Sequence, residues 1–178
     1  ITSALTMTAD RGGPGEVIKM TQMKFARRHF LVGSATMIAI AATPLIARTA
    51  TPTLHVLKDP HCGCCGAWIE ILRRDGLGVT SEDVDAEFLL RFKLENGIPE
   101  TMISCHTAQV DGYLIEGHVP PADIRRLLDE RSDAVGLSVP GMPFGSRGMG
   151  AEDEREAYDV FLIRGDGRTE VFTRYDAA

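Results

Sequence analysis

The stretch Asp59-Pro-His-Cys62-Gly-Cys64-Cys65-Gly-Ala-Trp68 decides the fold, because it places three of the four cysteines within four consecutive positions. An apolar run of strand type covers 53–58, and 67–74 has apolar residues at helical spacing. The cysteines are therefore expected on a strand-to-helix turn. Cys62 and Cys65 have the Cys-x-x-Cys spacing that fits either a redox dithiol or two ligands of one metal ion.

The start of a helix favours thiolate chemistry. Its unpaired N–H groups and the positive end of the helix dipole lower the pKa of a thiol placed there, and the thiolate is the form that attacks disulfides and binds metals. Inert structural disulfides are the alternative. They are less favoured here, because the adjacent Cys64 and Cys65 cannot easily pair with each other.

Composition bounds the class of protein. The 178 residues, 44% of them hydrophobic, suit one globular domain. Residues 51–178 hold thirteen Lys or Arg and twenty-three Asp or Glu side chains, a formal charge of −10. Such a body is a poor candidate for nucleic-acid binding, which needs a basic face. No Walker loop, dinucleotide fingerprint, His-Glu-x-x-His motif or nucleophile elbow occurs.

The first fifty residues are expected to lie outside the folded domain. Residues 1–22 lack periodicity, and we interpret them as upstream, non-native translation, with the natural start at Met23 or Met20. Residues 23–50 predict an export signal, with a basic start, an apolar stretch and small residues beyond it. The pair Arg27-Arg28 followed by Phe30 is typical of a twin-arginine signal, which exports folded proteins. A membrane anchor is the alternative, but we expect no stable span in the mature form.

The remaining chain, 51–178, predicts alternating strands and helices. A short strand is expected at 79–84, then a helix from the Asp85 N-cap to residue 95, with its Phe and Leu side chains in the core. The Asp111-Gly112 dipeptide between 105–110 and 113–115 predicts a hairpin, and 121–130 predicts a helix that starts with proline. The Gly- and Pro-rich segment 133–150 is expected to be loop, followed by strands at 158–164 and 169–174.

This order predicts an α/β fold of thioredoxin-like type, a βαβα-ββα core with an added C-terminal β-hairpin. In such folds the first hairpin begins with a proline that faces the dithiol. Here Cys105-His106 stands in its place. We therefore expect Cys105 to approach the cysteines at 62–65, although it could instead be a small buried hydrophobe on a strand.

Four separated motifs resemble one known family. They are Pro60-x-Cys62-Gly63-Cys64-Cys65-Gly66-x-Trp68, Ser104-Cys105-His106-Thr107, Gly112-Tyr113-x-Ile115-Glu116-Gly117-His118-Val119-Pro120 and Val139-Pro140-Gly141-Met142-Pro143-x-Gly145-Ser146. Together they resemble the predicted metal-binding family that includes the CopG-type copper-resistance proteins. The resemblance covers roughly residues 53–175. His61 departs from it, since a small residue such as Thr is expected there.

The resemblance implies a periplasmic copper-binding protein of copper handling, with copper ions and other periplasmic copper-handling proteins as partners. Soft thiolates select Cu(I), and crowded thiolates can bridge several ions. Cys62, Cys64, Cys65 and Cys105 are the expected ligands. His106, His118, Met142 and Met149 are weaker candidates, and imidazole would also suit Cu(II). Cycling between Cu(I) and Cu(II), and hence a copper oxidoreductase activity, stays open.

Two other functions compete with copper binding. A thiol–disulfide oxidoreductase of thioredoxin type would use Cys62 to attack and Cys65 to resolve the mixed disulfide. The extra thiol of Cys64 would interfere with that exchange. A structural zinc site would use all four cysteines, but adjacent Cys64 and Cys65 would have to splay apart to share one tetrahedral ion.

Overall fold

The structure, a computed structural model, describes residues 52–178. The expected upstream segment 1–22 and export signal 23–50 lie outside the described residues and stay predictions. Within 52–178, no helix is long and apolar enough to cross a membrane.

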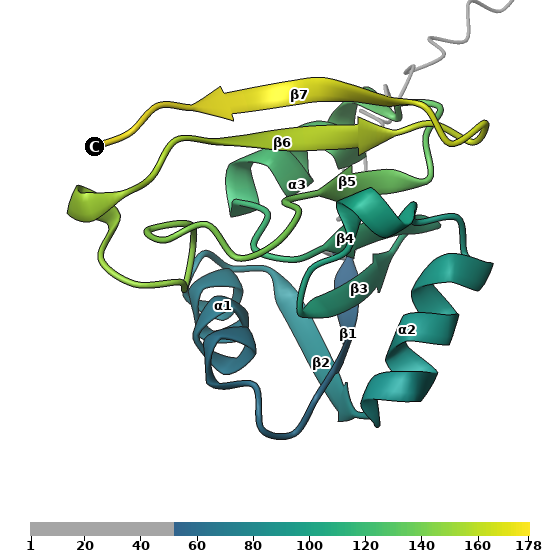
Figure 1. The fold of residues 1–178 in the computed structure, drawn as a ribbon, viewed down its shortest axis with the longest axis horizontal. Helices are drawn as coiled ribbons and strands as arrows, with labels where there is room; N and C mark the ends of the chain where they lie inside the picture. The colour runs from purple at the N-terminus through teal and green to yellow at the C-terminus, as the bar shows by residue number, and fades with distance from the viewer. Residues whose placement is uncertain (1–51) are drawn as a thin grey trace, which may run out of the picture. The chain divides into compact units, whose positions relative to one another are not determined.

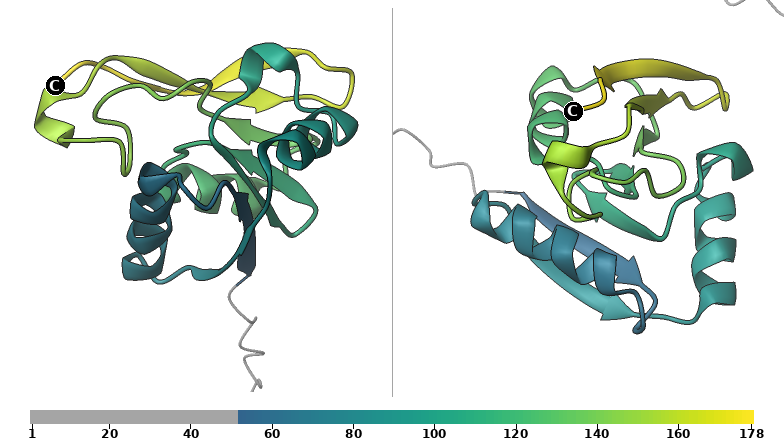
Figure 2. Two further views of the ribbon diagram at one scale, coloured as in Figure 1. Left: turned by 60° about the horizontal axis from the view of Figure 1, so that its bottom comes forward. Right: turned by 60° about the vertical axis from the view of Figure 1, so that its left-hand side comes forward.

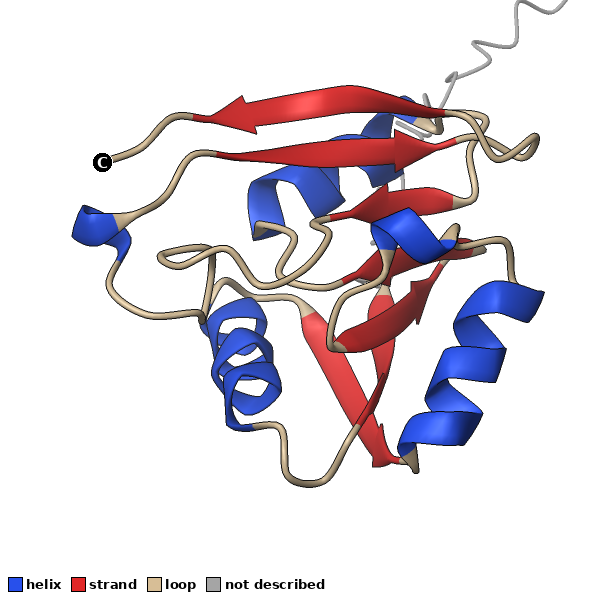
Figure 3. Cartoon of the chain, in the orientation of Figure 1, coloured by secondary structure: helices blue, strands red, loops and turns tan. Residues whose placement is uncertain are grey.

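The described residues form a seven-stranded sheet in the order β2-β1-β3-β4-β5-β6-β7 (Figures 1 and 3). The strands are β1 Thr53–Lys58, β2 Gly78–Asp83, β3 His106–Val110, β4 Tyr113–Glu116, β5 Gly136–Ser138, β6 Tyr158–Ile163 and β7 Thr169–Tyr175. The α-helices are α1 Gly63–Arg74, α2 Ala86–Glu95 and α3 Pro121–Glu130, with short 3-10 helices at Glu100–Met102 and Glu152–Glu154. The α/β class and the βαβα-ββα order are confirmed, with the C-terminal hairpin added as predicted.

The two faces of the sheet have separate apolar cores. Trp68 and Leu72 of α1 share the larger core with Ile124 and Leu127 of α3. The smaller core, which contains Ile98, lies on the other face, and Figures 1 and 2 show α1 and α2 on opposite sides of β1 and β3. Each fully buried Leu or Ile contributes about 1.5–3 kcal/mol, so the larger core is the main anchor of α1.

Local signals in the sequence are confirmed at two turns. The carboxylate of Asp85 accepts a hydrogen bond from the backbone N–H of Phe88, at 2.8 Å, and so caps α2. Asp111 and Gly112 have φ of 48° and 86°, the left-handed values that a two-residue hairpin turn requires.

Two predictions about local structure are wrong. The segment 133–150, predicted to be loop, contains β5, which pairs in parallel with β4 and antiparallel with β6. Gly136 makes this pairing possible, because a Cβ there would overlap the carbonyl of Leu114. Helix α1 begins at Gly63 rather than at 67, since burial of Cys65 outweighs the weak helix propensity of the two glycines.

The prediction that the Phe and Leu side chains of α2 lie in the core is also wrong for most of them. Phe88, Leu90 and Leu94 are 39–47% exposed. The buried side chains of this helix are Leu89 and Lys93, four residues apart on one face. Only a narrow face of α2 is therefore covered, and a lysine lies in it.

Candidate metal centre

The cysteines come together because of the strand order. Strand β1 runs antiparallel to β3, and Lys58 at its end is paired with His106 at the beginning of β3. The turn that follows β1 therefore lies beside the residue that precedes β3. That turn carries Cys62 as the N-cap of α1, with two more cysteines in its first turn, and Cys105 immediately precedes β3.

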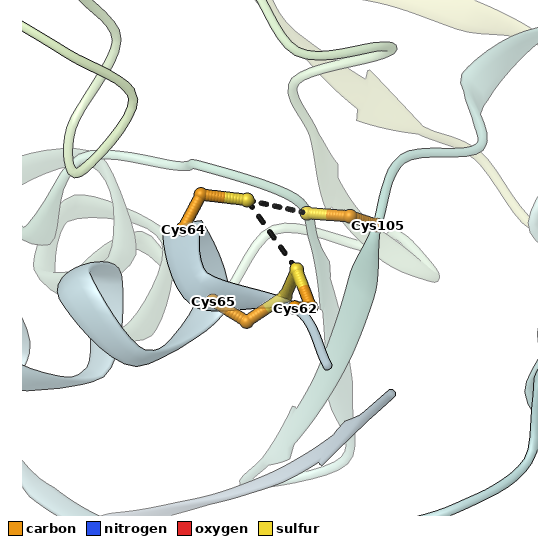
Figure 4. Close-up of side chains that lie close together, drawn as sticks. All are labelled: Cys62, Cys64, Cys65 and Cys105. Carbon is orange, nitrogen blue, oxygen red and sulfur yellow. Dashed lines mark hydrogen bonds between the residues drawn. A yellow bond between two sulfur atoms is a disulfide. The ribbon is translucent and has the colours of Figure 1, made fainter. Parts of the chain in front are cut away.

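Four sulfur atoms gather at this point (Figure 4). Cys62 and Cys65 form a disulfide, with their Cα atoms 5.5 Å apart. The sulfur of Cys64 lies 3.3 Å from that of Cys62 and 3.9 Å from that of Cys105. All four Sγ atoms lie within 4.8 Å of one another. Once the disulfide is reduced, the arrangement offers four soft ligands in the space of a metal centre.

Two imidazoles extend the site from Cys105. The Cys105 sulfur lies 3.2 Å from Nδ1 of His106 and 3.3 Å from Nε2 of His118. We call Cys105, His106 and His118 the sulfur–imidazole group; their ligand atoms also lie within 4.8 Å of one another. Cys105 thus belongs to both sets of possible ligands.

His118 has the geometry of a metal ligand held from behind. Its Nδ1 lies 2.8 Å from the backbone carbonyl oxygen of Arg147, so Nδ1 carries the proton and donates it. That leaves the lone pair of Nε2 directed at the Cys105 sulfur. Histidine ligands of metals are commonly oriented by such a bond from their second nitrogen. Burial lowers the pKa of His118, which favours the neutral, ligating form.

His106 lies deeper and is less well satisfied. It is fully buried, its ring packs against Trp68 with centroids 4.3 Å apart, and its Nε2 has no hydrogen-bond partner. Burial, together with the neighbouring His118, lowers its pKa well below the ordinary range. His106 is therefore a neutral ring with one polar atom unpaired in the interior.

The charge state of Cys105 depends on the same burial. Burial, followed by the nearby Cys64, raises the pKa of the Cys105 thiol to about 12, although the Lys93 ammonium opposes this. In the metal-free protein this thiol is protonated at neutral pH. A metal ion that binds it must displace the proton.

A buried ion pair adjoins the cysteines, and no motif in the sequence marks it. Lys93 and Glu116 are 2% and 0% exposed, and Nζ lies 2.7 Å from Oε1. Burial raises the pKa of Glu116, although Lys93 works against this. We call Lys93, Ser104, Thr107 and Glu116 the ionic group, since the hydroxyl of Thr107 and the backbone of Ser104 complete its hydrogen bonds. The one available signal was a lysine in line with the buried Leu89 on an amphipathic helix.

The structure gives the remaining candidate ligands little support. Met142 is 53% exposed and Met149 is half-buried. The side chain of His61 is 93% exposed and lies 3.3 Å from the carboxylate of Asp59. His61 is therefore solvated.

The loop 141–150 contributes through its backbone. Besides the carbonyl of Arg147, it brings Gly148 against the start of α1, where a Cβ would lie only 2.7 Å from the backbone nitrogen of Trp68. Gly148 also has φ of 86°, which favours glycine. The Gly-rich sequence of this loop thus serves a close approach to the helix that carries the cysteines.

Two solved structures resemble this chain over most of its described length. One, described as "Copper resistance protein copG- Form 2", is 42% identical with a TM-score of 0.65, and the match covers 71% of this chain and 99% of that one. The other, described as "Copper resistance protein copG- Form 1", is 41% identical with a TM-score of 0.67, and covers 72% and 100%. The family described as "Protein of unknown function, DUF411" matches residues 102–149. No curated protein matches.

Proposed function

The chain belongs to the family of CopG-type copper resistance proteins, and from this premise we propose that it binds copper in a copper-handling role. One observation carries the proposal. Four sulfurs from two separate segments lie within 4.8 Å of one another, and a neutral imidazole is directed at one of them. Soft sulfur ligands favour Cu(I), and the imidazole would extend the site to Cu(II).

The proposed ligands are Cys62, Cys64, Cys65 and Cys105. Reduction of the Cys62–Cys65 disulfide takes up two electrons and two protons, and copper then displaces protons from the thiols. Crowded thiolates can bridge more than one Cu(I), which spreads their negative charge over several cations. Among the further candidates His106, His118, Met142 and Met149, the geometry favours His118, because its tautomer is fixed by the Arg147 carbonyl.

The proposal includes a periplasmic location and copper-handling proteins as partners. Export through the twin-arginine signal expected at 23–50 would let the domain 51–178 fold, and load metal, before it meets oxidising surroundings. Cycling between Cu(I) and Cu(II) is an extension of the same site. It would make the protein a copper oxidoreductase.

A copper titration tests the proposal. The reduced chain is titrated with Cu(I) without oxygen, against a chromophoric Cu(I) chelator. We expect tight binding of more than one copper per chain and loss of stoichiometry in Cys64→Ser. Thr173→Val, which removes a hydrogen bond to Asp123 on α3, is the control for a general loss of stability. Failure of the wild-type chain to compete with the chelator would contradict the proposal.

A second candidate function is thiol–disulfide exchange, and the Cys62–Cys65 disulfide favours it. Cys62 is half-buried while Cys65 is fully buried, as suits an attacking and a resolving thiol. Cys64 weakens this candidate, because its sulfur lies 3.3 Å from Cys62 and would compete for the mixed disulfide. Rapid reduction of a model disulfide through Cys62, combined with weak copper binding, would favour exchange over copper.

Zinc is the third candidate. Four thiolates could close a tetrahedral structural site. Cys64 and Cys65 are adjacent in the first turn of α1, yet their sulfurs already lie within 4.8 Å of each other, so adjacency does not exclude a shared zinc ion. A zinc-loaded protein would be colourless and redox-silent, whereas Cu(II) absorbs visible light and is paramagnetic.

A further inference from the structure

The buried pair Lys93–Glu116 calls for an explanation other than stability. Moving two charges out of water costs several kcal/mol for each ion, and a buried ion pair is often no more stabilising than apolar side chains of the same size. Both side chains are almost completely buried here. The function of the pair must therefore be sought in what it holds.

The pair holds the backbone of Ser104 at both of its polar groups. The ammonium of Lys93 donates to the Ser104 carbonyl oxygen at 2.6 Å, and the Ser104 N–H donates to Oε1 of Glu116, also at 2.6 Å. The second carboxylate oxygen of Glu116 accepts from the hydroxyl of Thr107. Glu116 thus fixes residues on both sides of Cys105-His106.

Cys105 depends on these bonds because the sheet does not hold it. The register between β1 and β3 ends at the pair Lys58 and His106, and between β3 and β4 at Thr107 and Glu116. Cys105 lies one residue before β3. Its sulfur must nevertheless stay within 3.9 Å of Cys64 and 3.3 Å of His118 to join the two ligand sets.

We propose that Lys93 and Glu116 are positioning residues that fix the backbone before β3, and so hold the Cys105 sulfur at the distance at which it shares a metal with Cys64 and His118. This inference rests on the proposed function for the metal. The positioning itself can be measured without metal. Partners behind metal ligands commonly change metal affinity by about 10–100-fold when they are removed.

The test variant is Lys93→Met/Glu116→Gln. It removes both charges without leaving one unpaired, and the Gln oxygen can still accept from the Ser104 N–H, while the Ser104 carbonyl loses its donor. Thr107→Val, which removes only the hydroxyl that donates to Glu116 and leaves the ion pair intact, is a milder second variant in case the double variant does not fold. Thr173→Val is the matched control, because it removes a partly buried hydrogen bond at a group that contains no sulfur.

The first readout is the distance between two sulfurs. In a Cys62→Ser/Cys65→Ser background, diamide oxidises the Cys64 and Cys105 thiols to a disulfide and is itself reduced to the hydrazine. We expect fast cross-linking in this background and in the control, several-fold slower cross-linking in the double variant, and slower cross-linking by a smaller factor in Thr107→Val. Equal rates in the folded variants would overturn the inference.

The second readout is Cu(I) affinity with all four cysteines present, expected to fall about tenfold or more in the double variant and to stay unchanged in Thr173→Val. The two readouts separate the two claims. If the wild-type chain binds no Cu(I) but cross-linking still slows, the proposed function fails and the positioning stands. If the wild type binds Cu(I) and the double variant equals it in both readouts, the positioning role is wrong and the function stands.

Discussion

The ionic group and the sulfur–imidazole group are neighbours at the ends of β3 and β4, but they differ in hydrogen bonding. The buried polar atoms of the ionic group have partners, whereas those of the sulfur–imidazole group are partly without them. Both oxygens of Glu116 accept hydrogen bonds, and Lys93 has two acceptors. In the sulfur–imidazole group, Nε2 of His106 has no partner, and Nε2 of His118 faces a sulfur. One group is closed by its own bonds, and the other is open to a ligand.

The difference is consistent with the roles proposed for the two groups. A satisfied buried network makes one backbone geometry strongly preferred, because any movement leaves a charge unpaired in a low dielectric. An unsatisfied group costs stability unless something else completes it. The molecule places a rigid group directly behind an open one, which is the arrangement that a preorganised metal site requires.

The largest effect on stability is expected when only one partner of the Lys93–Glu116 ion pair is removed. Lys93→Met leaves the Glu116 carboxylate buried without its cation, which costs about 3–5 kcal/mol in the free energy of unfolding. Urea unfolding of metal-free protein measures it. Lys93→Met/Glu116→Gln is expected to recover much of the loss. A single variant as stable as the double one would show that the ion pair does not close this group.

The next largest effect, on copper affinity, is expected from removal of the Cys105 sulfur, which both ligand sets share. Cys105→Ser is expected to lower Cu(I) affinity about 100-fold, or about 2.7 kcal/mol, while the free energy of unfolding of the metal-free protein changes little. Chelator competition and urea unfolding on the same samples separate these effects. Unchanged copper stoichiometry and affinity would remove Cys105 from the ligands.

A pair of histidine variants sharpens the comparison inside the open group. His118→Phe removes the oriented Nε2 and is expected to lower copper affinity about tenfold. His106→Phe keeps a ring against Trp68 and removes an unpaired nitrogen, so the metal-free protein is expected to be equally or more stable. Each variant is the other's control. A greater copper loss in His106→Phe would reverse the assignment.

The smallest effect on stability is expected at a third hydrogen-bonded group, which lies around Asp123 and contains no sulfur. Asp123 accepts hydrogen bonds from Thr173 and Tyr175, and Tyr175 stacks on Tyr158. Burial raises the pKa of Tyr158 to about 12, and burial followed by the bond to Asp123 also raises the pKa of Tyr175.

Because the folded pKa values of these tyrosines are raised, the protonated forms stabilise the fold below about pH 10, and this contribution is lost as pH rises toward 12. Tyr158 is only 9% exposed, and it contributes on the order of 1 kcal/mol. Thermal unfolding between pH 8 and 11 should show a steeper decline in the wild type than in Tyr158→Phe, with equal copper affinity at pH 7. Parallel pH profiles would contradict this expectation.

Much of the fold could be predicted from local signals, because those signals act within a few residues. The Asp85 cap and the Asp111-Gly112 turn are determined by their own side chains and backbone. The missed strand β5 is different. Its three residues become a strand only because β4 and β6 offer hydrogen bonds on both sides, and that depends on tertiary context.

The candidate site divides in the same way. The sequence selected the four cysteines and both histidines from spacing and from a family resemblance. It did not select Lys93, which looks like an ordinary helix residue until its partner is known, and for Glu116 it offered no reason to choose. Nor did it indicate the backbone carbonyl of Arg147, because a carbonyl oxygen is present at every residue and only the path of the loop makes this one distinctive.

The sulfurs differ in how far a second protein could reach them. Cys65 is fully buried, while Cys62, Cys64 and Cys105 are half-buried. A metal passed between proteins by exchange of one ligand at a time must enter and leave through the three accessible sulfurs, with Cys65 the last to bind and the first to lose contact. The burial of one cysteine thus leaves a single side of the site, formed by Cys62, Cys64 and Cys105, through which a partner protein could exchange ligands with a bound metal.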